Sequence, residues 1–307
     1  MKLSVSERNS LWRDLQRGEL SSFQLEEGVW RFKSPIEGPH LWVVGAIHGN
    51  EAVGAVIVQA LLARALSGSL ISRGTVTMVI GNPEAFLRDV RYIEEDLNRA
   101  FHQELNACSS LEGLRQVLLA KLLASDPPDF VLDLHSVSRG DHGIIVYPTA
   151  SSMWAERLGC LETHFCYDQD HMAGATLIDA AQALGAGVMV VECGHHHSPK
   201  TVDVAMSHIS RLFNYFEMNG SPEEVDNDRP ARVIRFLSVA MIKPGPNFRF
   251  THPLETGSEL DKGQCFAVDD DQEHITDNRV WVMMPSLTVH PTDADAGWLC
   301  RREVINL

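Results

Sequence analysis

Long hydrophobic runs are missing from this 307-residue sequence. The longest uncharged apolar stretch lies between Asp179 and Glu192, which is well short of the about 20 residues that a membrane helix needs. No apolar segment follows the charged N-terminus, so we expect no signal peptide. These absences argue against a membrane protein and against secretion.

Basic residues and closely spaced cysteines are also scarce. The chain has 26 Lys and Arg against 41 Asp and Glu, a formal charge of −15, and such a chain would repel the phosphate backbone of a nucleic acid. The six cysteines form no C-x-x-C pair. A chain of this length can bury a core without disulfides, so we expect reduced thiols and a cytoplasmic location. Whether the chain forms a homo-oligomer stays an open question at this point.

The remaining composition is that of a globular protein, with 44% hydrophobic and 22% charged residues. Short apolar runs that read as strands alternate with segments of helical spacing, and this alternation predicts an α/β domain with a mixed central sheet flanked by helices. The expected strands are 41–47, 76–80, 130–134, 144–147 and 188–191, and the expected helices are 51–66, 111–123, 175–184 and 202–216.

The character of the sequence changes near Asn219. The stretch NGSPEEVDNDRP is polar and contains two prolines, which is typical of a linker. Short strand-like pieces punctuated by Gly and Pro follow it. We therefore predict a catalytic domain over 1–218, a linker over 219–229 and a smaller β-rich C-terminal domain over 230–307.

The motif His48-Gly49-Asn50-Glu51 stands where a predicted strand gives way to a helix. An imidazole and a carboxylate are good ligands for Zn²⁺, and both side chains can converge at such a bend. His135, in the segment Asp133-Leu134-His135, ends another predicted strand, at the sheet edge where α/β proteins place ligands. Two His and one Glu would leave one coordination position for water, as in catalytic zinc sites. The alternative is that each side chain only forms hydrogen bonds in a loop.

Two further segments carry charges of interest. Arg91 and Arg99 bracket acidic residues in RYIEEDLNR, which by itself is typical of a solvated run of ion pairs. Guanidinium groups facing a metal could instead bind a carboxylate or an oxyanion. Glu192 ends an apolar strand, where a carboxylate is costly unless it is paired or used. Beside a metal-activated water it would be a general base, and otherwise it would be a surface contact.

Taken in order, HGNE, RYIEEDLNRAF, DLHS and VECG resemble the succinylglutamate desuccinylase/aspartoacylase family, a branch of the zinc-carboxypeptidase-like hydrolases. The C-terminal stretch FRFTHPLETGSELDKGQCFAV is similar as well. The resemblance implies a zinc-dependent hydrolase with one Zn²⁺ per chain and an N-acyl amino acid as substrate. It implies that His48, Glu51 and His135 bind the metal and that Glu192 is the general base. It further implies that Arg91 stabilises the oxyanion and that Asn98 and Arg99 bind the substrate carboxylate.

The sequence departs from the aspartoacylase pattern on the acyl side of the substrate. Aspartoacylases use a further arginine shortly before the catalytic Glu, whereas residues 176–184 contain none, and Arg139 is the available substitute. The acyl group and the amino acid therefore stay open. Two alternative functions also stay open. One is a metallocarboxypeptidase acting on a short peptide-like amide, and the other is a non-catalytic binding protein on the same scaffold.

Two smaller predictions concern neighbours of the motifs. His195, His196 and His197 follow the Glu192 segment, and we expect them to line the mouth of the cleft rather than to bind one ion. Asp133 is a candidate partner of a metal-bound imidazole, although a strand neighbour is expected to point to the opposite face. The role of Asp133 therefore stays open.

Overall fold

The computed structural model describes residues 2–101, 109–138, 143–160, 163–168, 175–220, 232–286, 289 and 295–306. The helices are α1 Val5–Leu15, α2 Val53–Leu66, α3 Pro83–Arg88, α4 Leu111–Ser125, α5 Ser152–Arg157, α6 Leu177–Ala183 and α7 Lys200–Tyr215, with short 3-10 turns η1 Gly18–Phe23, η2 Leu97–Arg99 and η3 Thr149–Ser151. The strands are β1 Gln24–Glu26, β2 Val29–Lys33, β3 His40–Gly45, β4 Thr75–Ile80, β5 Phe130–Val137, β6 Ile144–Pro148, β7 Thr163–Tyr167, β8 Gly187–His195, β9 Arg232–Met241, β10 Phe248–Phe250, β11 Ser258–Leu260, β12 Cys265–Asp269, β13 Gln272–Ile275, β14 Val280–Met283 and β15 Trp298–Asn306.

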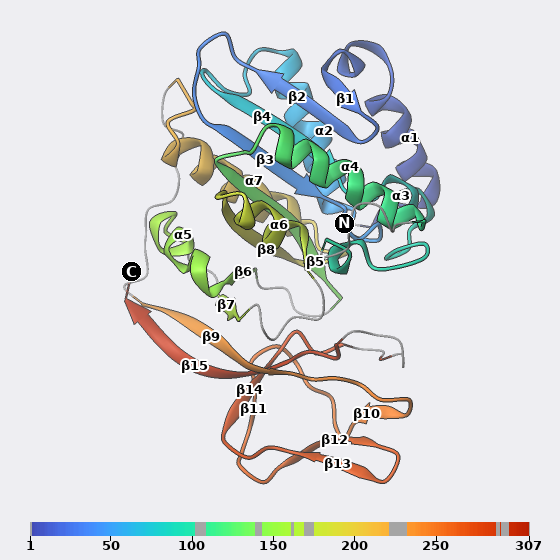
Figure 1. The fold of residues 1–307 in the computed structure, drawn as a ribbon, viewed down its shortest axis with the longest axis vertical. Helices are drawn as coiled ribbons and strands as arrows, with labels where there is room; N and C mark the ends of the chain where they lie inside the picture. The colour runs from blue at the N-terminus through green and yellow to red at the C-terminus, as the bar shows by residue number, and fades with distance from the viewer. Residues whose placement is uncertain are drawn as a thin grey trace.

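One large mixed sheet organises the molecule (Figure 1). Its strand order is β1-β2-β4-β3-β5-β8-β6-β7-β9-β15-β14-β11. The four central strands β4, β3, β5 and β8 are parallel to one another, whereas β6 is antiparallel to β8. Parallel strands need helical crossovers, so α2 and α4 connect distant positions along the chain and place helices on the sheet faces.

Both faces of the central sheet are covered by apolar side chains. Along β3, Leu41 and Val43 belong to a core shared with α2 and α7, while Trp42 and Val44 belong to a core shared with α4 and α6. Successive strand residues point to opposite faces, so a strand buried on both sides must be apolar throughout. This is the reason that 41–47 reads as a continuous hydrophobic run.

Helix boundaries follow local capping. Ser4 begins α1 and Thr176 begins α6 with reciprocal capping boxes, and the Ser110 side chain accepts the first-turn amide of α4. Helix α2 begins only at Val53, so Glu51 lies in the preceding turn. The predicted strand ends at His135 and Glu192 were wrong. Strand β5 continues to Val137 and β8 to His195, because the two strands remain paired beyond those residues.

The C-terminal strands continue the sheet and also have a core of their own. Strand β9 pairs in parallel with β7, and β15, β14 and β11 follow it. A second sheet, β10-β12-β13, closes over a separate apolar cluster that includes Phe248, Leu260 and Phe266. The predicted fold class, a mixed α/β sheet with a β-rich C-terminal part, is confirmed. Residues 221–231 lie outside the described residues, so the division into domains stays a prediction.

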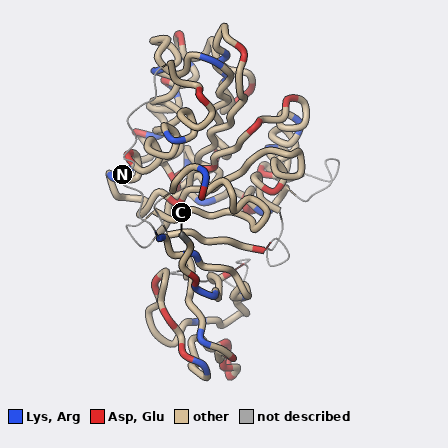
Figure 2. The backbone as a smooth tube through the Cα atoms, turned by 90° about the vertical axis from the view of Figure 1, so that its left-hand side faces the viewer, with Lys and Arg blue, Asp and Glu red and all other residues tan. Residues whose placement is uncertain are grey.

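Among the described residues, acidic and basic positions alternate along the backbone (Figure 2). Cys160, Cys166, Cys193, Cys265 and Cys300 are free thiols, and Cys108 lies outside the described residues. None of the helices in the described ranges combines the length and the apolar character that crossing a bilayer requires.

Candidate active site

The turn between β3 and α2 brings His48 and Glu51 together. His48 Nδ1 lies 2.9 Å from Glu51 Oε1, and both side chains are buried, at 4% and 3% exposed. The turn begins at Ala46, which adopts a positive φ of 49° that strains a non-glycine residue. Gly49 is required by close packing, since a Cβ there would lie 2.1 Å from the Ala85 carbonyl carbon. The backbone of the HGNE motif therefore packs directly against α3, and a side chain larger than that of glycine does not fit at position 49.

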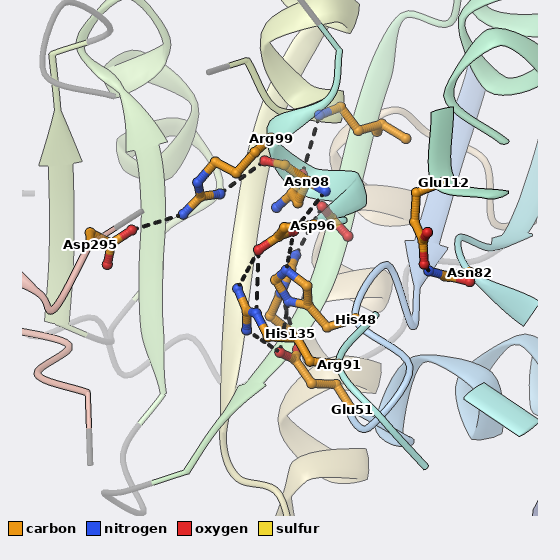
Figure 3. A network of polar contacts seen from close by, with 12 residues as sticks. His48, Glu51, Asn82, Arg91, Asp96, Asn98, Arg99, Glu112, His135 and Asp295 are labelled. Carbon is orange, nitrogen blue, oxygen red and sulfur yellow. Dashed lines mark hydrogen bonds and ion pairs between the residues drawn. The ribbon is translucent and has the colours of Figure 1, made fainter. Parts of the chain in front are cut away.

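His135 completes a cluster of three ligand atoms (Figure 3). Its Nδ1 lies 3.1 Å from Glu51 Oε2, and one ligand atom each of His48, Glu51 and His135 lie within 4.8 Å of one another. The three residues that sequence spacing predicted as metal ligands are thus brought together from β5 and from the β3–α2 turn. Among the described residues, this is the one group of three or more with metal-ligand geometry.

Two carboxylates hold the far sides of the two imidazoles. His48 Nε2 lies 3.1 Å from Asp96 Oδ1, and His135 Nε2 lies 3.0 Å from Asp133 Oδ2. Metal-binding histidines characteristically donate their other N–H to such a carboxylate, which sets the tautomer and leaves the inner nitrogen free for the ion. The residues present therefore fit a divalent metal: two inner nitrogens, one carboxylate and both outer partners are in place.

Asp133, whose role the sequence left open, is the partner of the His135 imidazole. Asp133 and His135 are two residues apart in β5, so they share a face of the sheet rather than pointing to opposite faces. Burial by itself would lower the pKa of His135, but the carboxylates of Asp133 and Glu51 raise it well above its ordinary value in the metal-free protein. Metal uptake must consequently release a proton from this imidazole.

The pKa of Glu51 shows how strongly its neighbours favour the ionised carboxylate. Burial by itself would raise this pKa, but the charges and hydrogen bonds of His135 and His48 hold it well below the ordinary range. Its Oε2 also accepts the backbone N–H of Ser136 at 2.9 Å. Glu51 is therefore held as an anion between the two rings, which is the state a metal ligand requires.

Arg91 lies beside this cluster. Its guanidinium donates to Asp96 Oδ2 at 3.0 Å, and its Nη1 lies 3.8 Å from Glu51 Oε1. The side chain is 46% exposed. Its backbone carbonyl accepts the Gly49 amide at 3.0 Å, which ties this segment to the metal-ligand turn. The arginine is thus placed next to the cluster and remains reachable from outside.

Asn98 and Arg99 are held by protein groups. Asn98 is buried and accepts the Leu177 amide at 3.3 Å, which links η2 to the start of α6. Arg99 Nη2 lies 3.1 Å from Asp295 Oδ2, and its Nη1 donates to the Asn98 carbonyl. The sequence reasoning missed Asp295. It stands 196 residues from Arg99, and no motif around it carries a signal.

Glu192 lies across from His135 on the adjacent strand. Residues 135 and 192 are direct partners in the β5–β8 register. The Glu192 side chain is 6% exposed, and its Oε2 has no hydrogen-bond partner in the described structure. Burial raises the pKa of Glu192 to about 7; the charge of His135 opposes this shift and that of Glu51 adds to it. A carboxyl that exchanges protons near neutral pH is suited to acid–base work.

We expect Glu192→Gln to stabilise the metal-free protein increasingly as pH rises. The pKa of Glu192 is raised by burial from 4.5 to about 7, so the unfolded chain loses this proton first. The neutral Glu192 carboxyl therefore makes its whole contribution to the unfolding free energy below about pH 4.5. This contribution is lost as the pH rises through about 7. Glutamine stays neutral, so its advantage in unfolding free energy should reach about 3 kcal/mol by pH 8. Urea unfolding of the wild-type protein and Glu192→Gln, below about pH 4.5 and at pH 8, measures this difference in unfolding free energy. A difference that does not change with pH would contradict the raised pKa of Glu192.

Glu112 anchors the arginine-bearing segment from behind and was also missed. It is buried, and its carboxylate accepts the backbone amides of Ile93, Glu94 and Glu95 as well as the Asn82 side chain. A carboxylate that accepts several backbone amides fixes the path of that backbone. Figure 3 shows Glu112 and Asn82 apart from the metal-ligand cluster, on the α4 side. Its only sequence signal is an acid in the first turn of a helix.

Arg8 of α1 forms hydrogen bonds with the backbone of the metal-ligand turn. Its side chain is 2% exposed, donates to the carbonyls of Gly49, Asn50 and Phe86, and pairs with Asp89 at 2.6 Å. The N-terminal helix is therefore connected directly to the HGNE backbone.

We expect Arg8→Met to lower the free energy of unfolding by about 3 kcal/mol, because the carbonyls of Gly49, Asn50 and Phe86 and the paired carboxylate lose a charged donor. Urea unfolding measures the loss. Arg13→Met is the matched control, since Arg13 is exposed on the same helix and should change stability by about 0.5 kcal/mol or less. Equal effects of the two substitutions would contradict the anchoring role.

The three histidines that follow Glu192 differ in exposure, and His195 and His196 are half-buried. His196 Nδ1 lies 2.7 Å from Ser136 Oγ, next to the cluster, while the His197 side chain is exposed. Arg139 lies outside the described residues. The stretch 176–184 forms α6 and its ends, where Asp179 accepts the Tyr167 hydroxyl.

Comparison with known proteins decides the family. The profile described as succinylglutamate desuccinylase/aspartoacylase catalytic domain matches residues 37–215, more than half of the chain. The chain belongs to this family. Membership confirms the relationship predicted from the motifs and supports hydrolysis of the amide bond of an N-acyl amino acid. The family is generally metal-dependent, in agreement with the His–Glu–His cluster.

Individual relatives agree over most of the chain. A succinylglutamate desuccinylase of Pseudomonas syringae pv. tomato is 29% identical over 288 residues, covering 84% of this chain and 81% of that protein. One from Pseudomonas fluorescens is 35% identical over 124 residues, 38% of this chain and 37% of that protein. The crystal structure of a succinylglutamate desuccinylase from Vibrio parahaemolyticus superposes with a TM-score of 0.70 at 19% identity, covering 91% of this chain and 90% of that one, which shows the shared fold.

Proposed function

We propose that this protein is a zinc-dependent hydrolase that cleaves the amide bond of an N-acyl amino acid. His48, Glu51 and His135 would hold one zinc ion, and Glu192 would be the general base. The observation that carries the proposal is the convergence of His48, Glu51 and His135 opposite a buried carboxyl on the neighbouring strand. Two outer carboxylates already orient the imidazoles for such an ion.

When bound, the ion would supply Lewis-acid chemistry that makes a water molecule more acidic. Glu192 would take a proton from the attacking water, a role that suits a buried carboxyl next to His135 in the strand register. It then delivers the proton to the leaving amine. Asp96 and Asp133 keep the inner imidazole nitrogens directed at Glu51 throughout.

Arginines would supply the remaining electrostatic contributions. Arg91 stands within 3.8 Å of Glu51 with part of its surface exposed, so it would stabilise negative charge that develops on the scissile carbonyl oxygen. Arg99, whose guanidinium lies 3.1 Å from the Asp295 carboxylate, would bind the substrate carboxylate together with Asn98.

The test is a turnover screen of zinc-loaded protein against N-acetyl and N-succinyl derivatives of several amino acids, with short peptides included. We expect release of free amino acid from at least one N-acyl derivative, loss of turnover after chelation, and recovery on adding zinc. Cleavage of peptides alone would favour a metallocarboxypeptidase. Turnover that survives chelation would contradict the metal-dependent mechanism.

A further inference from the structure

Strand β5 continues beyond the end of its neighbour β3. The last residues that the two strands pair are Gly45 and Leu134. Successive strand residues direct their backbone groups to alternate neighbours, and the Val137 carbonyl accepts the His196 amide at 2.9 Å, from the β8 side. The amide of Ser136 therefore points to the side where β3 has already ended. Ser136 is 4% exposed, so its amide needs a partner within the protein.

The partner of this amide is the candidate metal ligand Glu51. Glu51 Oε2 accepts the Ser136 amide at 2.9 Å and lies 3.1 Å from His135 Nδ1. Hydrogen bonds to an ionised carboxylate are about twice as strong as those between neutral groups, and a backbone donor moves only if the strand moves. The position of the Ser136 backbone therefore determines where the Glu51 carboxylate lies.

His196, in turn, contacts both the side chain and the backbone at the end of β5. Its Nδ1 lies 2.7 Å from Ser136 Oγ, and its amide donates to the Val137 carbonyl. The two contacts hold consecutive residues of β5. His196 therefore fixes the strand at the point where the backbone amide binds Glu51.

A bulge in β8 brings His196 to this place. Between His135 and Val137 the register of β5 against β8 shifts by one residue, so β8 has one residue more than β5 there. Gly194 lies in this segment, is buried and has a φ of 101°, which residues with a side chain rarely adopt. Because the bulge moves the end of β8 along by one residue, it determines which of the three consecutive histidines reaches Ser136.

We propose that His196 is a positioning residue for the metal ligand Glu51. It holds Ser136 so that the Ser136 amide keeps the Glu51 carboxylate in place for a divalent ion. The inference rests on the metal site of the proposed function. It goes beyond that function by giving a role to one of the three histidines that were expected only to line the mouth of the cleft.

The experiment measures the zinc dissociation constant, by competition with a chelator, in a double-mutant cycle of His196→Ala and Ser136→Ala. Each single substitution should weaken zinc binding about tenfold, the lower end of the range for outer partners of a metal site. If His196 acts through the Ser136 side chain, the double variant should also lose about tenfold, rather than the about hundredfold of independent effects.

Two further variants separate positioning from folding. His196→Asn can still form a hydrogen bond with Ser136 Oγ, so its zinc affinity should stay within about threefold of the wild type. His197→Ala is the matched control, because His197 is exposed on the same segment, and its zinc affinity should stay within about twofold of the wild type. If His196→Ala folds poorly, His196→Phe keeps the packing of a ring without the Nδ1 contact and should show the same loss of about tenfold.

Wild-type zinc affinity in His196→Ala or His196→Phe would overturn the inference and leave the proposed function intact. Independent losses in the double variant would also overturn it, because His196 would then not act through Ser136. A wild-type protein that binds no zinc would overturn the proposed function, and the positioning role with it.

Discussion

Glu192→Gln should lower kcat by about 10²- to 10⁴-fold, the usual contribution of a positioned general base. The substitution preserves the size of the side chain and removes its ability to take a proton. Because Glu192 is not one of the three clustered ligands, zinc content and affinity should stay near the wild-type values. Steady-state kinetics on the best substrate of the turnover screen, together with metal analysis of the same samples, measure both quantities.

Glu192→Asp is the matched control for this prediction. It keeps the carboxylate but withdraws it by one methylene, so its turnover should lie between those of the wild-type protein and Glu192→Gln. Wild-type turnover in Glu192→Gln would sink the assignment of this carboxyl as base. A parallel loss of zinc would instead place Glu192 among the metal ligands.

Glu51→Ala and His135→Ala should each abolish stoichiometric zinc binding, and turnover with it. Either substitution removes one of three donors whose ligand atoms lie within 4.8 Å of one another, so the ion would be left with two protein ligands. The loss of affinity should exceed the about 10- to 100-fold that is typical of outer partners. Equilibrium dialysis against a competing chelator measures the dissociation constants.

Asp133→Asn provides the graded comparison. It retains all three ligands but weakens the hydrogen bond to His135 Nε2, so zinc affinity should fall only by about 10- to 100-fold. The expected order of affinity is wild type, then Asp133→Asn, then the two ligand variants. Stoichiometric zinc in Glu51→Ala with wild-type affinity would refute the proposed coordination.

The ligand cluster could be predicted from sequence because its signals are local. His48 and Glu51 lie three residues apart at a strand-to-helix transition, and His135 lies in a strand whose apolar run marks it as central. Neighbouring parallel strands carry their side chains to a common edge, so chemistry-bearing residues at that edge meet. The same reasoning predicted that Glu192 lies near His135, but it ended both strands too early. The hydrophobic pattern does not show that two strands stay paired beyond their apolar residues.

The supporting residues could not be predicted for a different reason. Arg8 contacts backbone carbonyls 41, 42 and 78 residues away, and Glu112 accepts backbone amides about 18 residues away. A carbonyl or an amide has no sequence identity, so nothing in the chain marks it as the partner of a particular side chain. Asp295 illustrates the same limit for an ion pair, because its partner is specified only once the C-terminal strands are in position.

The continuity of the large sheet from β7 into β9 makes the C-terminal strands part of the frame of the enzyme rather than an appendage. Arg235 and Phe236 of β9 pair with His164 and Phe165 of β7. A chain ending before β9 would expose the open edge of β7, with unpaired amides and carbonyls that invite strands of other molecules. Shortened versions of this protein are therefore expected to self-associate rather than to yield an isolated catalytic half.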